Sequence, residues 1–139
     1  MATRHRIGIL NPDKSVTSVY CHWNGAPEDN GAILLEHYTD PAKIRALLSF
    51  GDMSSLGAKV SPDAVNTHSY DSPEAGVCVF YGRDRGETDV EPLDSSSPRD
   101  FLRAGEEYNY LFRNGAWYKV TQDRSGRLRY TLLTERNTR

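Results

Sequence analysis

Cys21-His22 is the first stretch of this sequence whose side chains could do chemistry. A thiolate is a nucleophile when a cation lies beside it, and a thiolate and an imidazole can share a zinc ion. The stretch reads as a β-strand, however, and adjacent side chains of a strand point to opposite faces. Cys21 is therefore expected to be a buried thiol, and His22 is left on the outer face as a candidate binding residue.

A wider metal site would need ligands from distant segments. The candidates are His22, His37, His68 and Asp71, whose side chains are all of ligand type. Nothing in their spacing makes them converge, and the chain has neither a His-Glu-x-x-His nor a Cys-x-x-Cys pattern. We predict no metal and no cofactor.

The second chemically suggestive stretch is YGRDRGE, residues 81–87, which places two arginines and two acids after an apolar run. Arg83 and Arg85 could grip a phosphate or a carboxylate, because the guanidinium fork matches both groups. Asp84 and Glu87 could instead pair with these arginines on a solvated turn. Both interpretations stay open.

A nucleotide pocket would join Arg83 and Arg85 to Arg6 and His22, provided that the sheet order brings them together.

An enzyme has no motif in its favour. The chain lacks a glycine-rich phosphate loop after a strand and a Gly-x-Ser-x-Gly elbow, and no Ser-His-Asp order can be recognised from spacing. We therefore favour a protein without catalytic residues, in which Asn24 and His37 are further polar candidates for binding.

Aromatic side chains gather in EEYNYLFRNGAWYKVTQ, the clearest hairpin of the chain, which turns at Asn114-Gly115. Such a set could be a stacking platform or a protein-binding face, or it could be half core and half cross-strand pairing. The candidates for binding in this hairpin are Tyr108, Tyr110 and Trp117.

Bulk composition limits the class of protein. The chain has 139 residues, 37% of them hydrophobic and 26% charged, and a net charge of −2. This balance argues against binding DNA by neutralising many phosphates, so nucleic acid is not an expected partner. Cys21 and Cys78 lie in apolar runs and read as buried thiols of a reducing compartment. The sequence has no apolar run long enough to span a membrane and no secretory signal, so we predict a cytoplasmic protein without a membrane partner.

The elements that must position these residues follow from period and turn signals. Val19, Cys21 and Trp23 share the more apolar face of a strand and are expected to meet the core. The expected elements are a hairpin over residues 4–23, a short helical segment near 33–38, a helix over 41–50, an irregular loop over 51–75, a central strand over 76–82, a helix from Ser97 to Gly105, the aromatic hairpin, and a last strand over 127–134.

These elements predict a single α+β domain over residues 1–139, with a polar tail at 134–139. Its fold is expected to be an antiparallel sheet of about five to six strands with two helices packed on one face.

The segment around Cys21-His22 also resembles a known family. Val-Tyr-Cys-His-Trp-Asn-Gly over residues 19–25, followed by Leu-Leu-x-His-Tyr over 34–38, resembles a family of short uncharacterised proteins encoded by tailed bacteriophages and prophages. The similarity extends to residues 51–56, 81–84 and 110–112, and so covers most of the chain. It implies a phage setting, and neither an activity nor catalytic residues.

In that setting, the sequence predicts a small binding protein that modulates a host process by docking on a host protein, as an inhibitor in host takeover or anti-defence. The alternatives are a protein that sequesters a small nucleotide signal, a virion accessory protein, and a small hydrolase or nuclease. Its location would be the host cytoplasm, and self-association into a homo-oligomer stays open.

Overall fold

The computed structural model describes residues 2–63 and 68–139. Its strands are β1 (His5–Leu10), β2 (Val16–Cys21), β3 (Met53–Ser55), β4 (Val79–Phe80), β5 (Leu93–Ser95), β6 (Tyr108–Arg113), β7 (Ala116–Gln122) and β8 (Leu128–Leu132). Its helices are the π-helix η1 (Pro27–Gly31), α1 (Ala32–His37), α2 (Pro41–Ser49), α3 (Tyr81–Arg85), α4 (Pro98–Arg103) and the 3₁₀ turn η2 (Arg136–Thr138). None of the helices within these residues is both long enough and apolar enough to cross a membrane.

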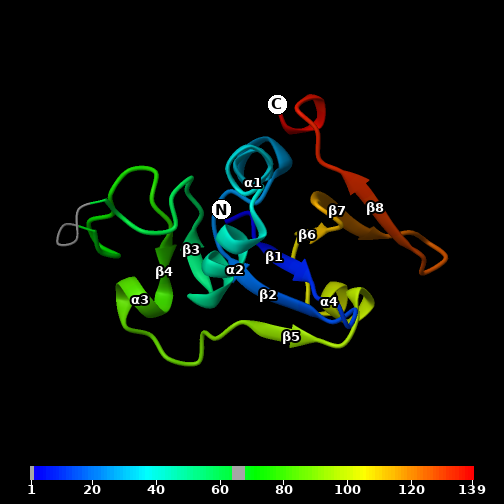
Figure 1. The fold of residues 1–139 in the computed structure, drawn as a ribbon, viewed down its shortest axis with the longest axis horizontal. Helices are drawn as coiled ribbons and strands as arrows, with labels where there is room; N and C mark the ends of the chain where they lie inside the picture. Colours follow the sequence, from blue (N-terminus) through cyan, green and yellow to red (C-terminus); the bar gives the residue numbers. More distant parts are fainter. Residues whose placement is uncertain (1, 64–67) are drawn as a thin grey trace.

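The strands form one mixed sheet in the order β4-β3-β2-β1-β6-β7-β8, and β5 pairs with β2 beside that path. Figure 1 shows β4 at one end of the sheet and β8 at the other, with α1 and α2 between them. The prediction of an α+β fold with a large sheet is confirmed. The described residues contain eight strands, however, where five to six were expected, and β1 runs parallel to β6 as β2 does to β3.

Helices lie on both faces of the sheet, and not on one face as predicted. One apolar cluster joins Leu34 of α1 and Leu47 of α2 to alternate side chains of β1, β2 and β6. A second, smaller cluster packs Phe101 of α4 against Val16. The intervening residues of the same strands supply this second face, so the central strands are buried on both sides.

Several local predictions are confirmed. The hairpin β1-β2 pairs His5 with Cys21, and β6 and β7 meet at Asn114-Gly115, both of which have positive φ. Such a two-residue turn matches the twist of the strands that it joins. Two expectations were wrong. The segment 51–75, expected to be an irregular loop, contains β3; its residues 64–67 lie outside the described part. The strand expected at the centre of the sheet, β4, lies at its end.

Helix α2 begins where the sequence predicts, because Asp40 accepts a hydrogen bond from the backbone N–H of Ala42 at 3.0 Å and Pro41 opens the first turn. We expect Asp40→Ala to lower the free energy of unfolding by about 1 kcal/mol. Asp40→Ser keeps an acceptor and should retain most of that stability. Urea denaturation of both variants tests this role; equal losses would exclude capping as the cause.

Candidate functional site

The Tyr-Cys-His-Trp-Asn-Gly segment leaves the sheet at the end of β2. Cys21, its last strand residue, is fully buried beside His5. Burial raises the pKa of the Cys21 thiol, with a smaller contribution from Cys78. The thiol is therefore neutral and shielded from solvent, as expected for a core cysteine and not for a nucleophile.

Trp23 is exposed to 42%, so the prediction that it meets the core is wrong. The alternation of β2 stops at Cys21, and the chain then turns through Asn24, which has a φ of 63°. The backbone stays anchored there, because the N–H of Trp23 donates to the carbonyl of Ser54 at 3.0 Å. The Asn24-Gly25 dipeptide is the sequence signal that could have ended the strand before Trp23.

The side chains of Tyr20 and His22 are ordered beside Trp23. The Tyr20 hydroxyl and His22 Nδ1 are 2.6 Å apart, which sets the plane of the imidazole ring. That ring meets the Trp23 indole edge-on, with centroids 4.7 Å apart and an angle of 88° between the planes. His22, Trp23 and Asn24 together form a surface on an ordered turn, which we name the Trp23 surface.

A buried polar pair lies beneath the Trp23 surface. His5 is fully buried, and Asn30 of η1 places its Nδ2 3.1 Å from His5 Nε2 and 2.8 Å from the Trp23 carbonyl oxygen. Since the Asn30 amide nitrogen can only donate, His5 Nε2 must be the acceptor and the ring is neutral. Burial lowers the pKa of His5 to about 4, although the backbone of Thr3 opposes that shift. Asn30 was not singled out from the sequence.

Gly25 fits closely over the same pair. A Cβ at this position would lie 2.6 Å from His5 Nδ1 and 2.6 Å from the Thr3 carbonyl oxygen. The Tyr110 hydroxyl donates to the Gly25 carbonyl at 2.6 Å, and it comes from β6 on the other side of β1. The turn is thus held from the sheet below, which fixes the position of the Trp23 surface.

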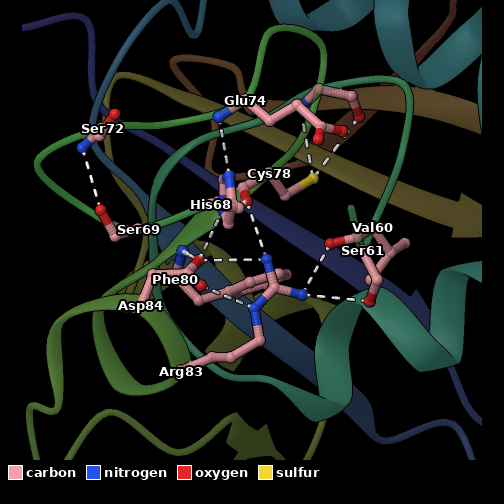
Figure 2. Close-up of polar contacts among 11 residues, drawn as sticks. Val60, Ser61, His68, Ser69, Ser72, Glu74, Cys78, Phe80, Arg83 and Asp84 are labelled. Carbon is pink, nitrogen blue, oxygen red and sulfur yellow. Dashed lines mark hydrogen bonds and ion pairs between the residues drawn. The ribbon is translucent and has the colours of Figure 1, made fainter. Parts of the chain in front are cut away.

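Arg83 and Asp84 of α3 belong to a second buried network, with His68 (Figure 2). His68 Nε2 lies 3.3 Å from Asp84 Oδ2 and 3.1 Å from the Cys78 carbonyl, while its Nδ1 accepts from the backbone N–H of Glu74 at 2.9 Å. The His68 and Asp84 side chains are only 2% and 5% exposed. Because both ring nitrogens are already hydrogen-bonded, His68 is suited to holding a loop and not to binding a metal.

Arg83, a predicted binding residue, uses its guanidinium inside the protein. Its nitrogens donate to both oxygens of Asp84, to Ser61 Oγ, and to the carbonyls of Val60 and Cys78 at 2.8 and 3.0 Å (Figure 2). The guanidinium carbon also lies 4.7 Å from the ring centre of Phe80. The structure contains the pairing of Arg83 with Asp84, one of the two interpretations of this stretch, but on helix α3 with the Asp84 side chain buried and not on a solvated turn.

The other basic candidates contact different residues from Arg83. Arg6 is nearly buried, and it donates to Ser18 Oγ at 3.1 Å and to the Ser18 carbonyl at 3.3 Å. Burial lowers the pKa of Arg6, against the opposing charges of Asp52 and Glu106. Arg85 is exposed and lies over the ring of Tyr70 at 4.7 Å. Among the described residues, Arg6 and Arg83 have no hydrogen-bond partner in common.

The remaining candidates divide between surface and core. His37 is exposed at the end of α1, with Nε2 3.6 Å from a Glu36 carboxylate oxygen. Tyr108 is half-buried and stacks on Tyr110, which is fully buried. Trp117 is 3% exposed and donates from Nε1 to the Tyr38 carbonyl at 2.8 Å. Tyr110 and Trp117 therefore stabilise the core and offer little surface to a partner.

Within residues 2–63 and 68–139, no three His, Cys, Asp or Glu side chains lie close enough together to hold a metal ion. A cleft of about 530 Å³ lies between α1 and the C-terminal turn, lined by Ala32, Leu35, Glu36, Thr134, Glu135 and Thr138. Its lining has two carboxylates and neither an arginine nor an aromatic ring. A nucleotide would find no favourable contact for its phosphates there.

No protein-family model, curated protein or solved structure matches the chain.

Proposed function

We propose that this protein acts by binding another protein, in a phage setting a host protein, whose process it modulates without chemistry of its own. The observation that supports this most directly is the exposure of Trp23 on an ordered turn. Tryptophan is among the residues most enriched at binding hot spots, because one side chain can bury a large area in a partner.

The order of the turn adds to the argument. Trp23 is held through its own N–H by Ser54 and through its carbonyl by Asn30, and the His22 ring packs against the indole. A binding surface that is fixed in advance loses little conformational entropy when a partner docks. The Trp23 surface is thus suited to recognition of a protein.

Sequestration of a nucleotide signal has less support. Arg83 and Arg6, which were to bind the phosphates, already donate to internal acceptors. A phosphate would have to displace these hydrogen bonds and to leave Asp84 with fewer donors. An enzyme is not motivated either, since the Cys21 thiol is buried and His68 Nδ1 already accepts a backbone hydrogen bond.

The test is capture of a stoichiometric partner from a bacterial host lysate, followed by measurement of its affinity for variants of this protein. We expect Trp23→Ala to weaken that complex by about tenfold or more, because hot-spot truncations cost roughly 2 kcal/mol. Leu93→Ala removes a similarly exposed apolar side chain from β5 and serves as the control. An affinity that survives Trp23→Ala unchanged would exclude the Trp23 surface as the docking site.

A further inference from the structure

β8 is the last strand of the sheet, and none of the described residues pairs with its outer side. It lies at the far end of the sheet from β4 (Figure 1). An edge strand presents backbone N–H and C=O groups to which another extended segment can add. We name this outer side the β8 edge.

The hydrogen bonds to β7 show which groups of β8 point outward. The N–H of Leu133 donates to Trp117, and the carbonyl of Arg127 accepts from Asp123, so the odd-numbered residues face β7. In an antiparallel pair, successive residues alternate between facing the partner strand and facing away from it. The even-numbered residues of β8 therefore form the β8 edge.

Leu128 and Tyr130 direct both an N–H and a C=O to the outside. The outward carbonyl of Leu132 is already occupied, since Asn137 Nδ2 donates to it at 2.9 Å. This contact agrees with the alternation and limits the free part of the edge to its first residues. An incoming strand would accordingly pair with Leu128 and Tyr130.

The side chains of the same strand differ between its two faces. Arg129 lies opposite Thr121 of β7, next to the register pair of Lys119 and Thr131. Its Nε donates to the Asp123 carboxylate at 3.0 Å, and its side chain is still 60% exposed. The other face carries the apolar side chains of Leu128, Tyr130 and Leu132, of which Leu132 is 46% exposed. A strand added to the edge would meet basic neighbours on one face and apolar neighbours on the other.

The charge of the chain is also divided unequally. Residues 116–132, which form β7, the turn and β8, contain four Lys or Arg and one Asp, whereas the rest of the chain contains thirteen basic and eighteen acidic residues. The hairpin of β7 and β8 is thus a basic segment of an acidic protein. Such asymmetry favours an acidic partner at the hairpin.

We propose that the β8 edge binds an extended segment of a partner protein in which acidic and apolar residues alternate. The segment would add to the sheet as a further strand, with acidic side chains beside Arg129 and an apolar side chain beside Leu128. This inference rests on the proposed protein-binding function and deepens it, because it gives the chemistry of one segment of the partner.

A second copy of the chain fits the edge less well. If two β8 strands paired antiparallel about Tyr130, Arg129 of one copy would face Thr131 of the other and lie diagonal to its Arg129. Like charges at such positions oppose pairing. Arginines on an edge discourage pairing of this kind, and they attract a strand that carries acids.

Single-stranded nucleic acid also fits less well. Base stacking requires an open aromatic face, and the Arg113 guanidinium lies over Tyr118 at 4.7 Å and over Tyr130 at 3.9 Å. The free groups of the edge are alternating backbone donors and acceptors, which match a peptide. A single-stranded oligonucleotide is nevertheless a useful competitor in the test.

The experiment uses the full chain and a short capped peptide in which glutamate and valine alternate, with binding followed by fluorescence anisotropy. Its matched control is the same peptide N-methylated at alternate residues, which keeps the charge and removes backbone donors. We expect the N-methylated peptide to bind at least about tenfold more weakly, because each lost hydrogen bond counts for roughly 0.5–1.5 kcal/mol. Leu128→Pro, which removes one outward N–H, should act in the same direction, and Leu93→Ala of β5 should leave peptide binding unchanged.

Four results would overturn the inference. The first is that the glutamate-valine peptide does not bind, and the second is that its N-methylated form binds with equal affinity. The third is that a single-stranded oligonucleotide binds more tightly and displaces the peptide. The fourth is that the protein forms a homodimer which Leu128→Pro dissociates. If the peptide binds but no host protein is captured, the inference about the β8 edge stands and the proposed function is wrong. If a host protein is captured through Trp23 but the peptide does not bind, the proposed function stands and the inference about the β8 edge is wrong.

Discussion

Asp84→Ala is expected to lower the free energy of unfolding by about 3 kcal/mol, the cost of removing one partner from a buried, hydrogen-bonded charge pair. The Asp84 carboxylate accepts from the backbone N–H of Phe80 at 2.8 Å, from Arg83 through Nε and Nη2, and contacts His68. Without it, the Arg83 guanidinium loses its counter-charge and the Phe80 N–H loses its acceptor. Urea denaturation at neutral pH measures the change.

The control for this variant is Asp71→Ala, which removes an exposed acid close to His68 in the sequence and should change stability by less than about 0.5 kcal/mol. Asp84→Asn keeps the shape and part of the hydrogen bonding, so its loss should be intermediate. Similar small losses for Asp84→Ala and Asp71→Ala would show that the network around α3 contributes little to folding.

The same carboxylate has a pH signature. Burial raises the pKa of Asp84, but the hydrogen bonds from Arg83 and Phe80 and the charges of Arg83 and His68 outweigh burial, and its pKa is lowered. The charged form is thus favoured by folding. The resulting stability is fully present above the pKa of an unfolded aspartate, about 3.9, and is lost as the pH falls through the lower folded value.

Local signals in the sequence predicted local structure well. Asp40-Pro41 and Ser97-Pro98 each begin a helix whose first turn is capped by the Asp or Ser side chain. Asp40 accepts from the N–H of Ala42 at 3.0 Å, and Ser97 Oγ accepts from the N–H of Asp100 at 3.2 Å. Asn114-Gly115 forms the predicted hairpin turn. These signals act within a few residues, so they do not depend on the rest of the fold.

Non-local pairing was not predictable in the same way. β1 pairs in parallel with β6, which brings His5 beside Tyr108 across more than half of the chain. Nothing in either segment specifies that neighbour. Likewise, Gly8 gives α4 room on the second face, because a Cβ there would lie 3.2 Å from the Phe101 ring. A glycine inside a strand indicates close approach, but it does not identify the approaching residue.

In the candidate site too, residues set by local signals were predictable and residues set by non-local contacts were not. The sequence singled out His22 and Asn24, which the structure places on the Trp23 surface, because polar residues near a turn are usually exposed. It did not find the buried pair of His5 and Asn30, which depends on η1 returning beneath the turn. The Arg83 network was half predicted: its pairing with Asp84 follows from sequence proximity, whereas the approach of His68 does not.

Stability should also fall as the pH decreases from 7 to 4, by about 3 kcal/mol from His5 alone. The pKa of His5 is lowered by burial from 6.5 to about 4, so the unfolded chain binds this proton at a higher pH than the folded protein does. A tenfold change in proton affinity corresponds to about 1.36 kcal/mol, so the difference between a pKa of 6.5 and one of about 4 gives a loss of about 3 kcal/mol. The loss begins near pH 6.5 and is complete below about pH 4, as linkage requires.

The matched pair for this test is His5→Gln and His37→Gln. Gln at position 5 can offer an oxygen to the Asn30 amide without titrating, so the slope of stability against pH should become flatter by the contribution of His5. His37 is exposed at the end of α1, so His37→Gln controls for the loss of a surface imidazole. If His5→Gln retains the full slope, the buried imidazole does not account for the pH dependence.

Protonation of His5 should also affect the Trp23 surface. An added proton on His5 Nε2 would face the Asn30 amide, which donates both there and to the Trp23 carbonyl, so two donors would meet without an acceptor. Asn30 would have to move, and the turn would lose one of its hydrogen bonds. We expect Trp23 fluorescence, measured in a Trp117→Phe background, to change with a midpoint near pH 4, and this change to be absent in His5→Gln.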